Sequence, residues 1–342
     1  MGDSLGKLRA AAVQAASVYL DREATVEKAC HLIRECGAKG ADFIVFPESY
    51  IPGYPFWVWL LPSFEGMDFA KELYKNALVA GSEATQRLGE AARAARAYVV
   101  MGCTERQGTA LFNSIFFFNR EGELAARRRK LRPTHAEKLV WGDGDGSDLF
   151  TVEGDFGIFG GMMCGEHFMD LCRYSLYAMG EQVHAALWPG VSAITHFPRY
   201  ERYFNDFTEV SSRHHAIAGG VFTVSAYGVA DEATVAKLGY ADRPEMMRVG
   251  GGRSAIFGPS GEVLAGPIED KEGVIFADLD LEDAISARQI RNAVGDYARP
   301  EVLSLHLNPK RQRVLVEEEP PRNPHMLEGN PFLLEEEHGG DE

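Results

Sequence analysis

Short apolar runs alternate with helical stretches along most of the chain. Leu8–Gln14 and Phe43–Phe46 have the length and apolar content of strands, and Thr25–Ala38 between them has the spacing of a helix. The second run stops at Pro47, which cannot donate a hydrogen bond to a sheet. The pattern therefore predicts a strand–helix–strand unit near the start of the chain.

The same alternation continues far into the chain. It predicts further strands over Tyr98–Cys103, Asn113–Phe118, Leu124–Leu131, Gly157–Cys164, Val183–Trp188, Val221–Ala226, Arg253–Phe257 and Val274–Leu279. It predicts further helices over Ser82–Arg96, Met169–Met179, Thr208–Ala218 and Glu282–Asn292. Tight turns such as Gly258–Gly261 join some strands and helices join others, so we expect a layered α/β fold with mixed sheets.

Composition and charge narrow the class of protein. The 342 residues are 45% hydrophobic and 25% charged, as in ordinary globular proteins. With 35 basic and 50 acidic residues the net charge is −15, which repels nucleic-acid phosphates. No apolar run approaches the roughly 20 residues that cross a bilayer. The five cysteines are odd in number and form no C-x-x-C pair, so we expect a reducing cytoplasm rather than a disulfide framework.

The acidic excess is concentrated at the C-terminal end. Between Glu317 and Glu342, nine acidic residues face one base, Arg322, so this stretch carries −8 and also contains four prolines. Such a segment buries little apolar surface. We therefore predict one globular domain over residues 1–308 and an acidic tail over residues 309–342.

The first candidate for chemistry is Glu48, which follows the apolar run Phe43–Phe46. In α/β proteins, sites are built at the carboxyl ends of strands, and desolvation there raises the pKa of a carboxyl group toward that of a general base. The alternative is an ordinary glutamate on a surface loop.

A basic segment, Arg127–Glu137, supplies the second candidates. Period-two alternation groups Lys130 with Arg128 and Arg132, so the pattern alone does not distinguish Lys130 from an arginine of a charged edge strand. Thr134 and Glu137 match a capping box, which by itself explains Glu137 as a structural residue.

The third candidate is Cys164, which ends an apolar run and precedes a predicted helix. A thiol at such a turn faces a cleft, and a helix N-terminus favours its thiolate, with a pKa below the usual value of about 8.5. Gly165 next to it permits close approach of the backbone. The alternative is a buried core cysteine, the interpretation that suits the other four cysteines.

These three segments, in this order, resemble the nitrilase superfamily of carbon–nitrogen hydrolases, which use a Glu–Lys–Cys triad. The motifs that carry the resemblance are Phe46–Glu48, Pro52–Leu60, Arg129–Gly146, Cys164–His167 and Tyr297–Pro300. Arg129–Gly146 and Tyr297–Pro300 fit the nitrilase branch, and Pro52–Leu60 is similar to the group that hydrolyses arylacetonitriles. The resemblance covers roughly residues 8–308.

The resemblance implies an α-β-β-α sandwich of two mixed sheets flanked by helices, which forms four layers and pairs with a second subunit or extends into larger homo-oligomers. It implies hydrolysis of nitriles, of aryl-aliphatic type, to carboxylic acid and ammonia through a thioimidate and an acyl-thioester. Cys164 would be the nucleophile and Glu48 the general base, while Lys130 would stabilise charge on nitrogen and Glu137 would orient that lysine or move protons. This chemistry requires no metal and no organic cofactor.

Substrate-binding residues are expected around the nucleophile and among nearby aromatic side chains. The candidates are Tyr54, Gly165, Glu166, His167, Trp188 and Pro189. Gly165 departs from the family, in which tryptophan normally follows the nucleophile. The missing indole predicts an enlarged pocket beside Cys164.

Two other interpretations stay open. The same triad suits an amidase or a nitrile-hydrating enzyme that releases amide. A protein of a different class, a catalytically silent filament or scaffold, could keep the fold for assembly alone, although Glu48, Lys130 and Cys164 together argue against it.

Overall fold

The structure is a computed structural model that describes residues 5–196 and 200–312. Contacts divide the chain into a unit Met1–Lys310 and a unit Arg311–Glu342. The tail expected over residues 309–342 lies outside the described residues from position 313 onward, so its predicted character stays a prediction.

Twelve strands of the described residues form two six-stranded mixed sheets. In spatial order, the first sheet consists of β12 (Gly273–Asp280), β1 (Lys7–Gln14), β2 (Phe43–Val45), β3 (Tyr98–Gln107), β4 (Ala110–Phe118) and β5 (Leu124–Arg129). The second consists of β11 (Val263–Glu269), β10 (Arg253–Phe257), β9 (Phe222–Tyr227), β8 (Val183–Trp188), β7 (Gly157–Met163) and β6 (Val152–Gly154). In each sheet three central strands are parallel and the outer pairings are antiparallel.

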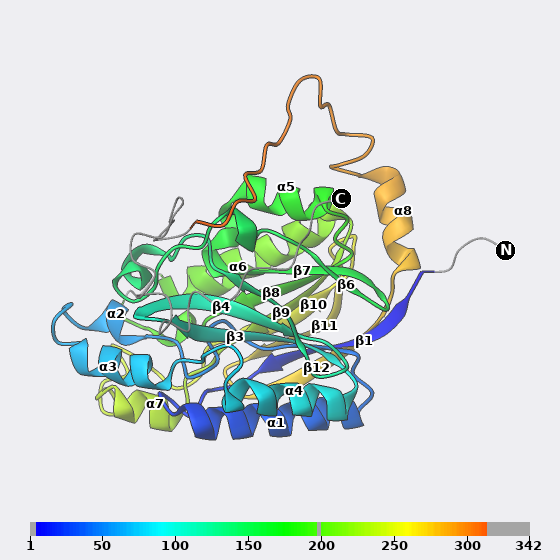
Figure 1. The fold of residues 1–342 in the computed structure, drawn as a ribbon. Coiled ribbons are helices and arrows are strands. Elements are labelled where there is room, and N and C mark those ends of the chain that lie inside the picture. Colours follow the sequence, from blue (N-terminus) through cyan, green and yellow to red (C-terminus); the bar gives the residue numbers. More distant parts are fainter. Residues whose placement is uncertain (1–4, 197–199, 313–342) are drawn as a thin grey trace, which may run out of the picture. The chain divides into compact units, whose positions relative to one another are not determined.

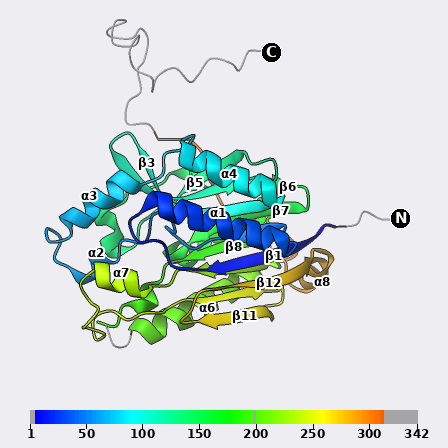
Figure 2. The same ribbon diagram turned by 90° about the horizontal axis from the view of Figure 1, so that it is seen from below.

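Helices cover the outer faces of the two sheets (Figures 1 and 2). The α-helices are α1 (Arg22–Ala38), α2 (Trp57–Leu60), α3 (Met67–Asn76), α4 (Glu83–Ala95), α5 (Asp170–Ala178), α6 (Tyr200–Gly219), α7 (Glu232–Lys237) and α8 (Glu282–Ile290). The pair α1 and α4 packs on the first sheet, and α5 and α6 pack on the second. This is the expected α-β-β-α sandwich.

Alternation along β1 shows how the sequence builds these layers. Ala11 and Val13 belong to the core beneath α1 and α4, whereas Leu8, Ala10 and Ala12 belong to the core between the sheets. Successive side chains of a strand point to opposite faces, so a strand that is buried on both faces is apolar throughout.

The elements predicted from the pattern are present, with end points that differ by a few residues. Helix α6 begins eight residues before the predicted Thr208. The sequence analysis missed β6, β11, α2, α3 and α7, which are short, partly exposed or polar. The turn at Gly258–Gly261 joins β10 to β11 as expected, with Gly261 at a φ of 83°. Within the described residues, no helix is long and apolar enough to cross a membrane.

Candidate active site

The ends of three strands bring the three candidate residues together. Glu48 lies three residues beyond β2, Lys130 follows β5 directly, and Cys164 follows β7 directly. Residues Glu48 and Lys130 come from the first sheet and Cys164 from the second, so the site lies where the two sheets meet. The charges of Glu48 and Lys130 both act on the Cys164 thiol.

Lys130 is the centre of the charged cluster. Its ammonium donates to Glu48 Oε1 and to Glu137 Oε2, both at 2.7 Å. The three side chains are at most 1% exposed. Burial lowers the pKa of Lys130, but the charges of Glu137 and Glu48 outweigh burial and raise that pKa well above its ordinary value. The lysine therefore stays a fixed positive charge.

Glu137 makes both the capping contact and the lysine contact that its sequence position left open. Its Oε2 accepts from the Thr134 backbone N–H at 2.7 Å, as the capping box predicts. Its Oε1 accepts from the Tyr54 hydroxyl at 2.7 Å, and Trp59 Nε1 donates to that hydroxyl at 2.9 Å. The cap and the lysine contact thus coexist on one carboxylate, and Tyr54 supports the carboxylate from the side away from Lys130.

Glu48 is incompletely satisfied. Its Oε1 accepts from Asn113 Nδ2 at 2.7 Å as well as from Lys130. Its Oε2 and Asn113 Oδ1 are buried and have no hydrogen-bond partner among the described residues. Burial raises the pKa of Glu48 to about 7, assisted by the charge of Glu137 and opposed by Lys130. Asn113 was missed in the sequence; the available signal is an amide within the otherwise apolar half of β4.

The Cys164 thiol differs from the sequence expectation. It is 7% exposed, and a five-residue 3₁₀-helix, Cys164–Phe168, rather than an α-helix follows β7. Burial and the charge of Glu48 raise the pKa of the thiol well above its ordinary value, although Lys130 and a hydrogen bond from the Gly165 N–H oppose the rise. The expected low thiolate pKa is therefore wrong, and a base must remove the proton.

Backbone strain is concentrated beside these residues. Ser49, His135 and Cys164 have φ angles of 48°, 45° and 42°, in the left-handed region that non-glycine residues rarely adopt. Ser49 adjoins Glu48, His135 lies within the Thr134–Glu137 turn, and Cys164 is itself a candidate residue. Each such conformation costs on the order of 1–3 kcal/mol and persists where the surrounding contacts impose it.

Thr134 bounds the space beside Gly165. A Cβ atom added at Gly165 would lie 2.7 Å from Thr134 Oγ1. The threonine therefore occupies the direction in which a larger side chain would start, and the expected enlargement of the pocket stays a prediction.

Glu166 is enclosed by the protein. Its Oε1 accepts from Arg128 at 2.6 Å and from the Leu131 N–H at 2.8 Å, and its Oε2 accepts from the Met163 N–H at 2.9 Å. It is 1% exposed. These contacts fasten the Cys164–Phe168 segment to the segment that carries Lys130.

The remaining substrate-binding candidates are buried near the nucleophile. The ring nitrogens of His167 contact the Cys164 carbonyl oxygen and His184, and its ring stacks on Trp188 at 4.6 Å between centroids. Trp188 shares one hydrophobic cluster with Cys164 and Tyr54. Pro189 is also buried.

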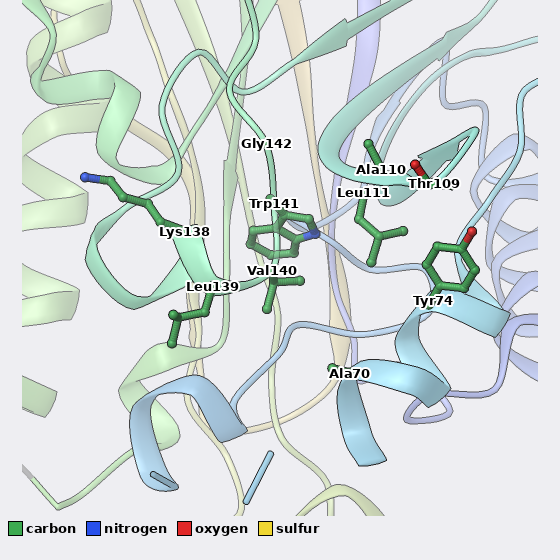
Figure 3. Close-up of a pocket in the computed structure, with 10 residues that line it drawn as sticks. All are labelled: Ala70, Tyr74, Thr109, Ala110, Leu111, Lys138, Leu139, Val140, Trp141 and Gly142. Carbon is green, nitrogen blue, oxygen red and sulfur yellow. The ribbon is translucent and has the colours of Figure 1, made fainter. Parts of the chain in front are cut away.

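A pocket of about 490 Å³ lies close to this cluster (Figure 3). Its lining comprises Ala70, Tyr74, Thr109, Ala110, Leu111, Lys138, Leu139, Val140, Trp141 and Gly142. Trp141 lines the pocket and also packs edge-on against Tyr54, 5.9 Å between centroids. The indole therefore contacts both the pocket and the ring of Tyr54.

The fold and the buried cluster of Glu48, Lys130, Glu137 and Cys164 agree with a comparison of the chain with known families. The model of the carbon–nitrogen hydrolase family matches residues 9–289. The chain therefore belongs to the carbon–nitrogen hydrolase family, whose members are hydrolases acting on carbon–nitrogen bonds.

Individual relatives add detail. The chain is 38% identical over 307 residues to an aliphatic nitrilase from Rhodococcus rhodochrous, covering 89% of this chain and 80% of that protein. It is 35% identical over 303 residues to an arylacetone-specific nitrilase from Alcaligenes faecalis, covering 88% and 85%. A carbon–nitrogen hydrolase from Helicobacter pylori G27, at 19% identity, shares the fold with a TM-score of 0.67 over 83% of this chain and 93% of that chain.

Proposed function

We propose that the protein hydrolyses organic nitriles to carboxylic acids and ammonia through covalent intermediates on Cys164. The observation that carries the proposal is the ammonium of Lys130, held between Glu48 and Glu137 at 2.7 Å from each, beside a buried thiol. This cluster offers a base, a fixed positive charge and a nucleophile. The relatives named as nitrilases support the choice of nitriles as substrates.

The first half of the reaction forms a thioimidate. Glu48 takes the proton of the Cys164 thiol, and a carboxyl group with a pKa of about 7 is a suitable base near neutral pH. The sulfur attacks the nitrile carbon, one π pair moves to nitrogen, and the proton on Glu48 passes to that nitrogen. Lys130 and the Gly165 N–H stabilise the negative charge that develops on nitrogen.

The second half releases both products. Water adds to the thioimidate carbon while Glu48 takes a proton from it, and the protonated nitrogen leaves as ammonia to give an acyl-thioester. A second water, deprotonated in the same way, releases the carboxylic acid and restores the thiol. Glu137 orients Lys130 and passes protons toward the departing nitrogen. One nitrile and two waters thus become one acid and one ammonia.

We further propose that the substrates are aryl-aliphatic. The cluster that holds Cys164 is rich in aromatic side chains, which pack well against an aryl ring. Its aromatic members include Tyr54, Phe56, Trp57, Trp141, Trp188 and Tyr227. The pocket beyond Trp141 has a volume typical of small-molecule sites and is the proposed approach for the substrate.

A panel of nitriles tests these proposals. Purified protein is incubated with arylacetonitriles and with short aliphatic nitriles, and ammonia, acid and amide are quantified. Ammonia and acid, released faster from arylacetonitriles, are expected. Amide as the main product would favour the nitrile-hydrating alternative. No product, together with a Cys164 thiol that stays inert toward iodoacetamide, would favour the silent scaffold.

We propose that two copies of the chain pair through the face formed by α5 and α6. Large apolar side chains are exposed there: Phe168 and Leu171 are 53% and 69% exposed, and Val210 is 65% exposed. Leu171→Arg is expected to convert a dimer into a monomer in light scattering. A wild-type protein that is monomeric would contradict this pairing.

The five free thiols favour a reducing compartment, and we propose the cytoplasm.

A further inference from the structure

A row of three buried side chains ends on the backbone of the nucleophile. His167 Nδ1 lies 2.9 Å from the Cys164 carbonyl oxygen, and His167 Nε2 lies 3.0 Å from His184 Nε2. His184 Nδ1 in turn lies 2.7 Å from Glu181 Oε1. All three side chains are at most 1% exposed, and the proposed mechanism uses none of them.

The two ends of this row fix its protons. The Cys164 carbonyl oxygen can only accept, so His167 Nδ1 must carry a hydrogen. The Glu181 carboxylate also only accepts, so His184 Nδ1 must carry one too. The contact between the two Nε2 atoms needs a third hydrogen. Burial lowers the pKa of His167 well below its ordinary value, so this ring is neutral and its Nε2 accepts. The third hydrogen therefore lies on His184 Nε2, and the positive charge of that ring balances the charge of Glu181.

The surroundings of Glu181 favour its ionised form. His215 Nε2 donates to Glu181 Oε2 at 2.8 Å, and its ring stacks on His184 at 3.6 Å between centroids. Burial raises the pKa of Glu181, but the two histidines outweigh it and hold that pKa at about 2. Burial lowers the pKa of His215 to about 3, so this ring is neutral.

The row is closely packed, and its members contact one another directly. Glu181, His184 and His215 are residue types that bind metals. Two ligands of one zinc ion, each about 2.0–2.2 Å from it, are separated by roughly 3.3 Å. The nitrogen–oxygen distances of 2.7 and 2.8 Å are direct hydrogen bonds instead. A Cβ atom at Gly160 would lie 2.3 Å from Glu181 Oε1, so only glycine leaves room for the carboxylate.

The carbonyl that His167 contacts belongs to the peptide unit of the Gly165 N–H. A peptide unit is planar, so fixing the carbonyl oxygen also fixes the direction of the N–H on the opposite side. The Gly165 N–H acts on the Cys164 thiol, because it lowers the pKa of that thiol. Cys164 itself holds a strained φ of 42°, a conformation that persists only where the surrounding contacts impose it.

We propose that His167, held by His184 and Glu181, is a positioning residue that fixes the Cys164–Gly165 peptide unit and aims the Gly165 N–H at the nitrogen of the reacting nitrile. The proposal rests on the proposed function. Donation to the carbonyl also polarises the peptide and strengthens its N–H as a donor.

A matched pair of variants tests this role. In His167→Asn the amide nitrogen takes the place of Nδ1 and can still donate to the Cys164 carbonyl. In His167→Leu the side chain has nearly the same shape as asparagine but cannot donate a hydrogen bond. Loss of one donor to a developing negative charge lowers kcat by about 10²–10³-fold, so we expect a loss of that order in the leucine variant with KM changed little. The asparagine variant is expected to stay within about tenfold of wild type.

Two further measurements keep the proposal open to refutation. The leucine variant should lose far less of its iodoacetamide reactivity than of its kcat, because alkylation needs the thiol and its base but no stabilised nitrogen anion, and the Gly165 N–H is the smallest of the influences on the thiol pKa. In wild-type protein with ¹⁵N-labelled histidine, NMR should show a hydrogen on His167 Nδ1, whether or not the leucine variant folds. A bare Nδ1, or equal kcat values for the leucine and asparagine variants, would overturn the proposal. A wild-type protein that releases no ammonia from any nitrile would instead overturn the proposed function and leave the NMR result intact.

Discussion

Two buried charge clusters meet at Cys164, and they differ in how completely their carboxylate oxygens are hydrogen-bonded. The front cluster comprises Glu48, Lys130 and Glu137, and the rear cluster comprises Glu181, His184, His215 and His167. In front, two carboxylates share one ammonium, one carboxylate oxygen has no partner among the described residues, and the pKa of Glu48 rises to about 7. At the rear, both oxygens of Glu181 accept from imidazoles and its pKa falls to about 2.

Burial of a carboxylate does not by itself decide the role of that carboxylate. Burial raises the pKa of both Glu48 and Glu181, and the neighbouring charges decide the outcome. A second carboxylate beside Glu48 keeps it poised to exchange a proton. Two imidazoles beside Glu181 fix its charge, and such a group serves as a rigid support. Reactivity is therefore expected in front and positioning at the rear.

The largest effect is expected where the two clusters meet. Cys164→Ala removes the nucleophile and should lower ammonia release by about 10⁴-fold or more, since the base and the lysine then have nothing to activate. Cys172→Ala, which removes another buried thiol, is the matched control and should retain activity. Measurable turnover in Cys164→Ala, or total loss in a folded Cys172→Ala, would reassign the nucleophile.

Glu137→Gln separates capping from proton chemistry within the front cluster. Glutamine also serves at the capping position, so a purely structural role predicts nearly full activity. We expect a loss of about 10²-fold, because glutamine cannot carry the proton. Removing the charge of Glu137 also lowers the pKa of Glu48, so the acidic limb of the kcat/KM profile, expected near pH 7, should move to lower pH. If the acidic limb does not move and the variant keeps full activity, Glu137 has only the structural role of capping the turn.

Replacing the buried glutamate with glutamine should change the stability of the protein in opposite directions in the two clusters. Folded Glu48 has a pKa of about 7 against an ordinary 4.5, so it binds its proton more tightly when folded, and stability is lost as pH rises from 4.5 through 7. Glu48→Gln should therefore stabilise the protein at pH 8 relative to wild type, by on the order of 1–3 kcal/mol, and much less at pH 5.

Glu181→Gln is the counterpart and should destabilise at both pH values. The depressed pKa of Glu181 means that its stabilising contribution is present above pH 4.5 and is lost only as pH falls toward 2. Chemical denaturation of both variants at pH 5 and pH 8 measures the two signs. If both variants lose stability at pH 8, the contrast between the clusters is refuted.

The smallest effect concerns the side of the front cluster that faces Gly165. Gly165→Ala places a Cβ atom 2.7 Å from Thr134 Oγ1, which must rotate away, at a cost of about 1 kcal/mol. A severalfold loss of kcat is expected, because the clash displaces Thr134, whose backbone N–H donates to Glu137. Thr134→Ala in the same chain should restore most of that loss, since the oxygen is then gone. Additive losses in the double variant would show that Thr134 does not limit the space.

The amino-acid pattern predicts ten of the twelve described strands, five of the eight described α-helices and the three strand ends at which chemistry is placed. Apolar runs indicate strands that are buried on two faces. The ends of three such strands are indicated by Pro47, by the basic segment around Lys130 and by the turn at Cys164. Local pattern could not choose Lys130 over Arg128, because both side chains prove buried and only contacts distinguish them. The resemblance of motifs, rather than periodicity, made that choice.

Only the tertiary structure decided the electrostatics. The pKa of the Cys164 thiol, expected low from a helix N-terminus, is raised because the thiol is desolvated and faces Glu48 from the other sheet. Asn113, the partner of Glu48, lies 65 residues away in sequence. Glu181 and His215 are 34 residues apart. The pKa of a buried group depends on which charges lie within a few ångströms of it, and that proximity arises only when the two sheets and their helices pack.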